Sequence, residues 1–162
     1  NEWGAPALLV VGASAVALAI QNVASAGDNI ISSPYLYGGT YNLFTNTLPK
    51  MGIEVRFADP SDPENFSKLS DNRTRAYFGE TLPNPQLVPF PILDIAKLGN
   101  EKGIPLIVDN TAAPITCRPF EYGAAVIVHS LTKFIGGHGT SIGGAIIDGG
   151  NFVWTKNTSN CK

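Results

Sequence analysis

Short apolar runs, separated by glycine, proline and polar residues, recur along the chain and predict a series of strands. The runs at 104–110 and 124–130 are apolar almost throughout and end in polar residues, which is typical of parallel strands buried on both faces. The predicted strands are 28–33, 53–58, 74–80, 104–110, 124–130 and 141–148.

Apolar residues at helical spacing predict helices between these strands. They recur in this way in residues 91–103, and again in residues 41–52, where Pro49 disturbs the last turn. Residues 37–40 predict a turn before the second of these helices. A short helix is expected after the turn-forming residues that follow the strand at 53–58.

The uncharged segment at residues 3–21 predicts a buried helix that continues to about Ala26. It is shorter than the roughly 20 apolar residues of a membrane span and is rich in small residues. Residues 24–27 resemble a signal-peptide cleavage site, which leaves a secretory signal as an alternative. A lysine or arginine at the start of the segment would support that alternative, and none is present.

Strands that alternate with helices indicate one α/β domain over residues 1–162, with a mainly parallel sheet and crossover helices. The net charge is −2 and no block of lysine or arginine occurs, which argues against nucleic acid or a membrane as a partner. Cys117 and Cys161 match no metal or disulfide spacing. We therefore expect no metal site and two free thiols in the cytoplasm.

Polar residues follow three consecutive predicted strands at the points where the strands end. They are Glu80, Asp109 and the segment from Ser130 to Lys133. Ligands of parallel sheets bind at the carboxyl ends of the strands. The sequence therefore predicts a site that combines two acids with a lysine flanked by hydroxyls.

Lys133 follows Ser130 and Thr132 and precedes a glycine-rich stretch, a context that admits several interpretations. The glycine spacing of a Walker A loop is absent, which argues against nucleotide hydrolysis. The preceding buried strand argues against an ordinary solvent-exposed lysine. A lysine held in a low-dielectric site has a lowered pKa and can form a Schiff base with a carbonyl cofactor. Pyridoxal phosphate is such a cofactor.

Binding of pyridoxal phosphate requires three kinds of protein group besides the lysine. A carboxylate must keep the ring nitrogen protonated, and Asp109 is the candidate, although an Asp-Asn-Thr sequence is also an ordinary turn cap. Hydroxyls and backbone amides must bind the phosphate, and Ser130 and Thr132 are placed to do so. A flat side chain should cover the ring, and Tyr37 is the candidate.

Several motifs together resemble one enzyme family. SLTKFIGGHGTSIGG, VDNTAAPITCRPFEYGA, YLYGGTYNLF and GETLPNP closely resemble the pyridoxal-phosphate-dependent enzymes of Cys/Met metabolism, and the resemblance runs from about residue 24 to residue 154. GGHGTSIGG and DGGNFVW are most similar to the O-acetylhomoserine sulfhydrylase branch. Cystathionine synthases and lyases of the family usually carry serine where this chain has Gly139.

The resemblance implies the large cofactor-binding domain of the aspartate-aminotransferase-like fold, with pyridoxal phosphate as cofactor, in a homo-oligomer (a tetramer built from dimers). It implies replacement of the acetyl ester of O-acetylhomoserine, or a close O-acyl relative, by sulfide, giving homocysteine and acetate in methionine and cysteine biosynthesis. Two alternatives stay open. One is a cystathionine γ-synthase or a methionine or cystathionine γ-lyase, and the other is an inactive truncated subunit with only a packing role.

The resemblance also implies roles for individual residues. Lys133 would form the Schiff base and move protons, Asp109 would pair with the ring nitrogen, and Tyr37 would stack on the ring. The other expected cofactor contacts are Ser130, Thr132, Gly12 and Ala13 at the phosphate and Asn84 near the ring hydroxyl.

Three further polar residues receive supporting roles. Glu80 is expected behind the residues that touch the cofactor, and His129 is expected to pack within its strand. His138 is expected to shape the glycine-rich loop rather than to transfer protons.

The chain also departs from the family pattern. Where the family has a Ser-Gly-Gln or Ser-Gly-Met turn that binds phosphate, residues 11–13 are Val-Gly-Ala. The family's N-terminal arm and its C-terminal domain, which carries the arginine for the substrate carboxylate, are not in this sequence. We therefore expect these 162 residues alone to bind the cofactor weakly and to lack turnover.

Overall fold

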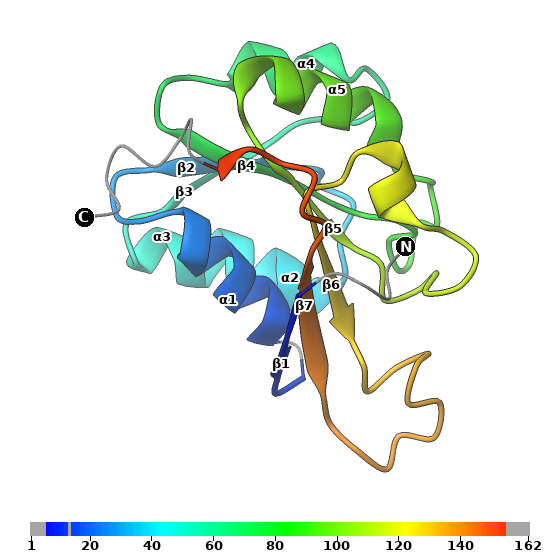
Figure 1. Cartoon of the computed structure of the whole chain (residues 1–162). Coiled ribbons are helices and arrows are strands. Elements are labelled where there is room, and N and C mark those ends of the chain that lie inside the picture. Colours follow the sequence, from blue (N-terminus) through cyan, green and yellow to red (C-terminus); the bar gives the residue numbers. More distant parts are fainter. Residues whose placement is uncertain (1–5, 13, 155–162) are drawn as a thin grey trace.

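A seven-stranded sheet with helices on both faces forms the structure, a computed structural model that describes residues 6–12 and 14–154 (Figure 1). The strands lie in the order β1-β7-β6-β5-β4-β2-β3. Their bounds are β1 Ala7–Val10, β2 Asn29–Ser32, β3 Glu54–Phe57, β4 Thr74–Glu80, β5 Leu106–Asp109, β6 Val126–Ser130 and β7 Gly144–Asp148. The helices are α1 Ser14–Val23, α2 Gly38–Asn42, η2 Leu43–Thr47, α3 Leu48–Lys50, α4 Glu64–Leu69, α5 Ile92–Lys102 and η3 Pro119–Tyr122.

The sheet is parallel from β3 through β6, and only β7 and β1 run antiparallel to their neighbours. The predicted α/β fold class with a mainly parallel sheet is therefore confirmed. The central strands alternate their side chains between two cores, because neighbouring residues of a strand point to opposite faces. Ile30 and Phe78 pack in the core under α1, whereas Ile31 and Tyr77 pack in the core under α4 and α5.

The first predicted helix is wrong in its first part and confirmed in its second, because α1 spans Ser14–Val23. Residues 7–10 form the edge strand β1, which pairs antiparallel with β7, and α1 begins only at Ser14. The hydrogen bonds of that pairing come from a strand more than 130 residues away, which local apolar content cannot reveal. Gly12 separates the two elements with a φ of 52°, in the left-handed region that glycine adopts without strain.

The turn predicted at residues 37–40 is also wrong, because helix α2 already begins at Gly38. The helical path continues through the π-helix η2 into α3, past Pro49. A proline has no N–H and crowds the carbonyl of the preceding turn, and the wider π-turn just before it accommodates that defect. Phe44 and Leu48 are buried on the inner face of this helical stretch, whereas Met51 is 49% exposed.

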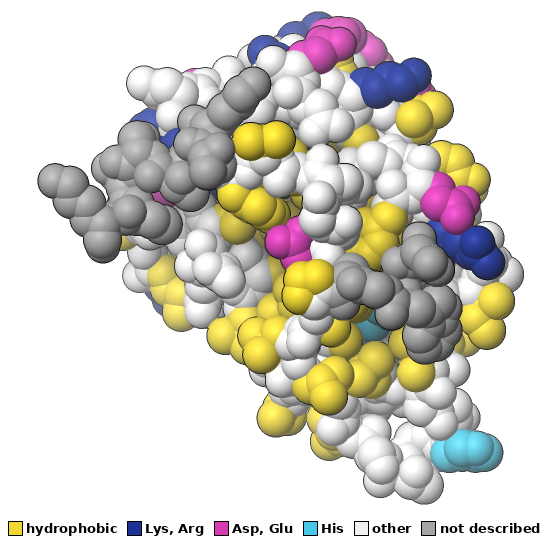
Figure 2. All heavy atoms as spheres, in the orientation of Figure 1, with side chains coloured by type: hydrophobic (Ala, Val, Ile, Leu, Met, Phe, Trp, Pro, Cys, Tyr) yellow, Lys and Arg dark blue, Asp and Glu magenta, His cyan; other side chains and the backbone are white. Residues whose placement is uncertain are grey.

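Most other elements lie where the apolar pattern predicts them. Strand β4 coincides with the predicted residues 74–80, and α5 ends at Lys102 with Gly103 as its C-cap, at a φ of 69°. Leu8 and Leu9 in β1 and Ile142 just before β7 are exposed apolar residues. Figure 2 shows exposed apolar side chains gathered over this part of the molecule. Among the described residues no helix is long and apolar enough to cross a membrane.

Replacing Gly144 by alanine is expected to lower the free energy of unfolding by about 1–3 kcal/mol. A Cβ at this position would collide with the carbonyl oxygen of Gly12 and would lie 3.1 Å from Val10 Cγ2. Backbone atoms cannot move aside as a flexible side chain can. Urea titration measures the change, and Gly38→Ala is the matched control, since a Cβ on Gly38 meets nothing within 4 Å. Equal stabilities for the two variants would contradict this close packing.

Candidate active site

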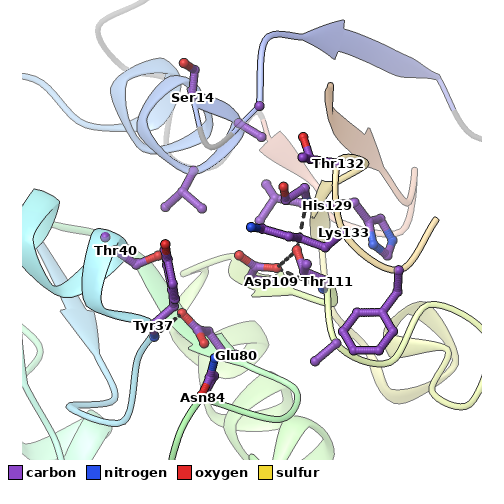
Figure 3. Close-up of a pocket in the computed structure, with 18 of the residues that line it drawn as sticks. Ser14, Tyr37, Thr40, Glu80, Asn84, Asp109, Thr111, His129, Thr132 and Lys133 are labelled. Atoms are coloured by element: carbon purple, nitrogen blue, oxygen red, sulfur yellow. Dashed lines mark hydrogen bonds between the residues drawn. The ribbon is translucent and has the colours of Figure 1, made fainter. Parts of the chain in front are cut away.

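A pocket of about 670 Å³ opens at the carboxyl ends of β4, β5 and β6 (Figure 3). It brings together all the predicted site residues that the structure describes, and Ala13 lies outside the described residues. Those that line it are Gly12, Tyr37, Asn84, Asp109, Ser130, Thr132 and Lys133. Glu80, expected further from the cofactor, and His129 also line the pocket. The pocket thus lies at the carboxyl ends of the strands, where the sequence analysis predicted a site.

Asp109 is the last residue of β5 and faces the pocket. Burial raises the pKa of its carboxyl group, and hydrogen bonds from Thr111 oppose this in part. The Thr111 hydroxyl donates to Asp109 Oδ1 at 2.5 Å, and the Thr111 backbone N–H donates to the same oxygen at 2.9 Å. These two bonds fix the carboxyl group in one orientation.

Thr111 is a site residue that sequence reasoning missed. Besides holding Asp109, its hydroxyl oxygen accepts a hydrogen bond of 2.8 Å from the backbone N–H of Ser130. It therefore connects the end of β5 to the start of the segment that carries Lys133 (Figure 3). The signal for it was the Asp-Asn-Thr triplet, since an aspartate side chain commonly accepts a hydrogen bond from the backbone N–H two residues later.

Lys133 follows β6 in a tight turn, in which its N–H donates to the carbonyl of Ser130 and its carbonyl accepts from Gly137. Gly136 is needed there, because a Cβ would lie 2.7 Å from the carbonyl oxygen of Leu131. The lysine side chain lines the pocket but is exposed to solvent. The expectation of a low-dielectric environment for this amine is therefore wrong for the described residues. The expectation fails because the apolar strand β6 ends at Ser130, three residues before the lysine, so the burial of the strand does not extend to the amine.

The hydroxyl groups predicted for the phosphate have different environments. Thr132 Oγ1 donates to the carbonyl of Gly143 and accepts from its N–H, at 3.2 and 3.0 Å, so it closes the base of the glycine-rich loop. Ser130 and Thr132 both line the pocket, as does the first turn of α1. The amino-terminal end of that helix carries partial positive charge and suits a phosphate. Ser14, at the start of α1, lines the pocket and was not predicted.

Tyr37 and Glu80 form the opposite side of the pocket (Figure 3). The backbone N–H of Tyr37 donates to Glu80 Oε1 at 2.9 Å. Burial and the neighbouring Asp109 raise the pKa of Glu80 to about 8, against the effect of hydrogen bonds from Tyr37 and Thr40. Asn84 lines the pocket beside them and is exposed.

The two histidines take the places expected of them. His129 is 5% exposed within β6, burial lowers its pKa, and its Nδ1 has no hydrogen-bond partner among the described residues. His138 is exposed in the glycine-rich loop. Among the described residues no group of three acidic, histidine or cysteine side chains is arranged to hold a metal ion.

These groups fit pyridoxal phosphate. The pocket offers an amine on Lys133, a buried carboxyl on Asp109, an aromatic side chain on Tyr37, and a helix amino terminus with nearby hydroxyls. They match in kind the carbonyl carbon, ring nitrogen, ring face and phosphate of that cofactor. The volume is within the range of cofactor sites.

Replacing Gly39 by alanine is expected to weaken pyridoxal phosphate binding about 5- to 30-fold with little loss of stability. The Tyr37 ring packs against Gly39, and a Cβ there would lie 2.7 Å from Tyr37 Cε1. The ring is the end of a flexible side chain, so it would move rather than strain the fold. Absorbance titration with the cofactor measures the change. Gly38→Ala, one residue earlier in the same turn and free of neighbours, should bind as the wild type does; equal weakening in both variants would exclude a role for the Tyr37 ring position.

Comparison with known proteins gives a consistent result. The sequence matches, over residues 2–162, the family described as Cys/Met metabolism PLP-dependent enzyme. It is 54% identical over 155 residues to the O-acetyl-L-homoserine sulfhydrylase of Leptospira meyeri, a match that covers 94% of this chain and 35% of that protein. The chain thus spans about a third of the length of this curated relative.

Solved structures agree with this match. A putative O-acetylhomoserine (thiol)-lyase from Campylobacter jejuni, which contains a pyridoxyl-lysine phosphate, superimposes with a TM-score of 0.88 and 42% identity. The match covers 91% of this chain and 37% of that one. Cystathionine gamma-lyase from Lactobacillus plantarum superimposes with a TM-score of 0.85 and 32% identity, covering 91% of this chain and 39% of that one.

Proposed function

The chain belongs to the Cys/Met metabolism family of pyridoxal-phosphate-dependent enzymes, and on this basis we propose that it is the cofactor-binding part of an O-acetylhomoserine sulfhydrylase. In the proposed reaction the bond between Cγ of O-acetylhomoserine and its ester oxygen breaks, and sulfide forms a carbon–sulfur bond at Cγ. The products are homocysteine and acetate. A close O-acyl relative would react in the same way.

The pocket that combines Lys133, Asp109 and Tyr37 is the observation that carries this proposal. When bound, pyridoxal phosphate supplies an electron sink for negative charge that develops next to the α-carbon of an amino acid. Asp109 would hold the ring nitrogen protonated, because a cation beside a buried carboxyl group favours its ionised form. Tyr37 would cover the face of the ring, which excludes water from it.

Lys133 would do the proton chemistry. Its amine would hold the cofactor covalently and, once released from it, would remove the proton from the α-carbon of the substrate. The turn after β6 places this amine on the same rim as Asp109. Thr111 holds the two parts of the rim together through its bonds to Asp109 and Ser130. Ser130, Thr132, Gly12 and Ala13 would serve the phosphate and Asn84 the ring hydroxyl.

A chimeric enzyme tests the reaction. Residues 2–162 would replace the matching stretch of the Leptospira meyeri relative, and acetate release and homocysteine formation would be measured with O-acetylhomoserine and sulfide. We expect both products. Cleavage of cystathionine or methionine without homocysteine synthesis from sulfide would instead support a γ-lyase. That second candidate is favoured by the similarity to the Lactobacillus plantarum structure, but its identity is only 32%.

The 162 residues alone are proposed to bind cofactor weakly and to lack turnover, and the remaining alternative is a chain with a packing role only. An absorbance scan after addition of pyridoxal phosphate distinguishes binding from a packing role.

We also propose that the chain works in the cytoplasm as part of a homo-oligomer, with small molecules rather than nucleic acid or membrane as partners. The exposed apolar residues Leu8, Leu9 and Val11 support association with other protein surface (Figure 2).

A further inference from the structure

Two carboxyl groups lie side by side at the rim of the pocket, and the proposed reaction uses only one of them. Glu80 ends β4 and Asp109 ends β5, and the two residues are paired in the register of the parallel strands. Both line the pocket. Asp109 has a role at the ring nitrogen, whereas Glu80 has none in the reaction described above.

Glu80 is buried, and its carboxyl group is hydrogen-bonded to the segment around Tyr37. It is 6% exposed, its Oε1 accepts the hydrogen bond from the Tyr37 backbone N–H at 2.9 Å, and the Thr40 side chain also bonds to it. Thr40 belongs to helix α2, which starts directly after Tyr37. None of the ion pairs among the described residues includes Glu80. One buried carboxyl group without a salt-bridge partner therefore connects the end of β4 to Tyr37 and to the first turn of α2.

We propose that Glu80 is a positioning residue that works in its protonated form: with its proton it holds Tyr37 and helix α2 at the pocket, and loss of the proton loosens that side. The inference rests on the proposed function, in which Tyr37 covers the cofactor ring. A neutral carboxyl group still offers a carbonyl oxygen to the Tyr37 N–H. The bonds from Tyr37 and Thr40 favour the ionised form, but ionisation would also place a second buried negative charge next to Asp109, and burial together with this repulsion outweighs the two bonds.

The titratable groups around Glu80 support this assignment. Asp109 faces it from β5, Tyr37 from the segment before α2, and Lys133 lines the same pocket from the segment after β6. Burial and Asp109 together raise its pKa from an ordinary 4.5 to about 8, so Glu80 carries its proton at neutral pH. The stabilising effect is then present in full below pH 4.5 and is lost as the pH rises through about 8.

Two measurements test the inference across pH 6–9.5: the dissociation constant for pyridoxal phosphate by absorbance titration, and the thermal unfolding midpoint without cofactor. The proteins are the wild type, Glu80→Gln, Glu80→Ala and the control Glu101→Gln, a surface acid on α5. The cofactor itself also titrates in this range, so each variant is compared with the wild type at every pH.

We expect Glu80→Gln to bind like the wild type at pH 7 and about tenfold more tightly than the wild type above pH 9, with a flatter pH dependence of the unfolding midpoint. Glu80→Ala should bind about tenfold more weakly at pH 7, and Glu101→Gln should follow the wild type throughout. The inference is overturned if Glu80→Gln binds as weakly as Glu80→Ala at pH 7, or keeps the wild-type pH dependence in both measurements. If Glu80→Ala does not fold, Glu80→Gln decides alone.

The outcomes also separate this inference from the proposed function. If the wild type binds no pyridoxal phosphate at any pH, the proposed function fails. The pH dependence of the unfolding midpoint in Glu80→Gln then decides whether Glu80 works in its protonated form.

Discussion

Replacing Lys133 by alanine is expected to abolish covalent attachment of pyridoxal phosphate and to lower turnover of the chimeric enzyme by about 10²- to 10⁴-fold. The expected loss is large because one amine serves both as the attachment point and as the group that moves protons. No other lysine lines the pocket. The fold should persist, because the turn around Lys133 is held by backbone hydrogen bonds and by Gly136, none of which needs the lysine side chain.

Borohydride reduction followed by peptide mass analysis measures the attachment. The wild type should carry the label on Lys133, and the alanine variant should carry none. Lys102→Ala is the matched control, because Lys102 is an exposed lysine at the end of α5, away from the pocket lining. A label on Lys102 or Lys156 in the wild type would show that the site assignment is wrong.

Replacing Asp109 by alanine is expected to lower turnover of the chimeric enzyme by about 10²- to 10³-fold, the usual effect of removing one pre-oriented charged group from an active site. The expected loss of turnover follows from the surroundings of the Asp109 carboxyl group. The carboxyl group is held by two hydrogen bonds from Thr111, and no basic side chain bonds to it among the described residues. Without it, the other carboxyl group of the described pocket, Glu80, is held on the Tyr37 side by its hydrogen bond from the Tyr37 N–H.

The ionisation of the bound cofactor gives the matching spectroscopic measurement. Asp109→Ala should shift the apparent pKa of the ring nitrogen downward, whereas Asp94→Asn, on the exposed face of α5, should leave turnover and spectrum unchanged. A turnover in Asp109→Ala within about threefold of the wild type would mean that another group holds the ring nitrogen. Asp109→Asn is the isosteric variant: its amide keeps the shape of the carboxyl group and removes the charge, so it should show the same loss as Asp109→Ala.

The location of the site was predictable because parallel sheets place strand ends together. Strand β4 and the strands that end in Asp109 and Ser130 are short apolar runs followed by polar residues, a pattern that local sequence carries completely. Their order along the chain then fixes which polar residues share a rim. Motif resemblance added the cofactor and the family, and the comparisons confirmed both.

Other features depended on partners far away in the sequence. Thr111 contributes through Ser130, 19 residues later, and Glu80 through Tyr37, 43 residues earlier. Neither partner can be read from a local pattern, because a hydroxyl or a carboxyl group after a strand has many possible neighbours. The edge strand β1 is the same case, since its residues look helical until β7 offers a row of backbone hydrogen bonds.

The sequence by itself therefore determined the fold class, the edge of the sheet where the pocket lies, and the amine and acid that meet there. These follow from the hydrophobic periodicity and from the order of the elements along the chain, both of which the sequence shows directly. Only the tertiary structure decided that Lys133 is exposed, that the Tyr37 ring packs against Gly39, and that Glu80 lies buried beside Asp109. The physical reason is that exposure and hydrogen-bond partners depend on what the rest of the chain brings to each position, and a protonation state follows from both.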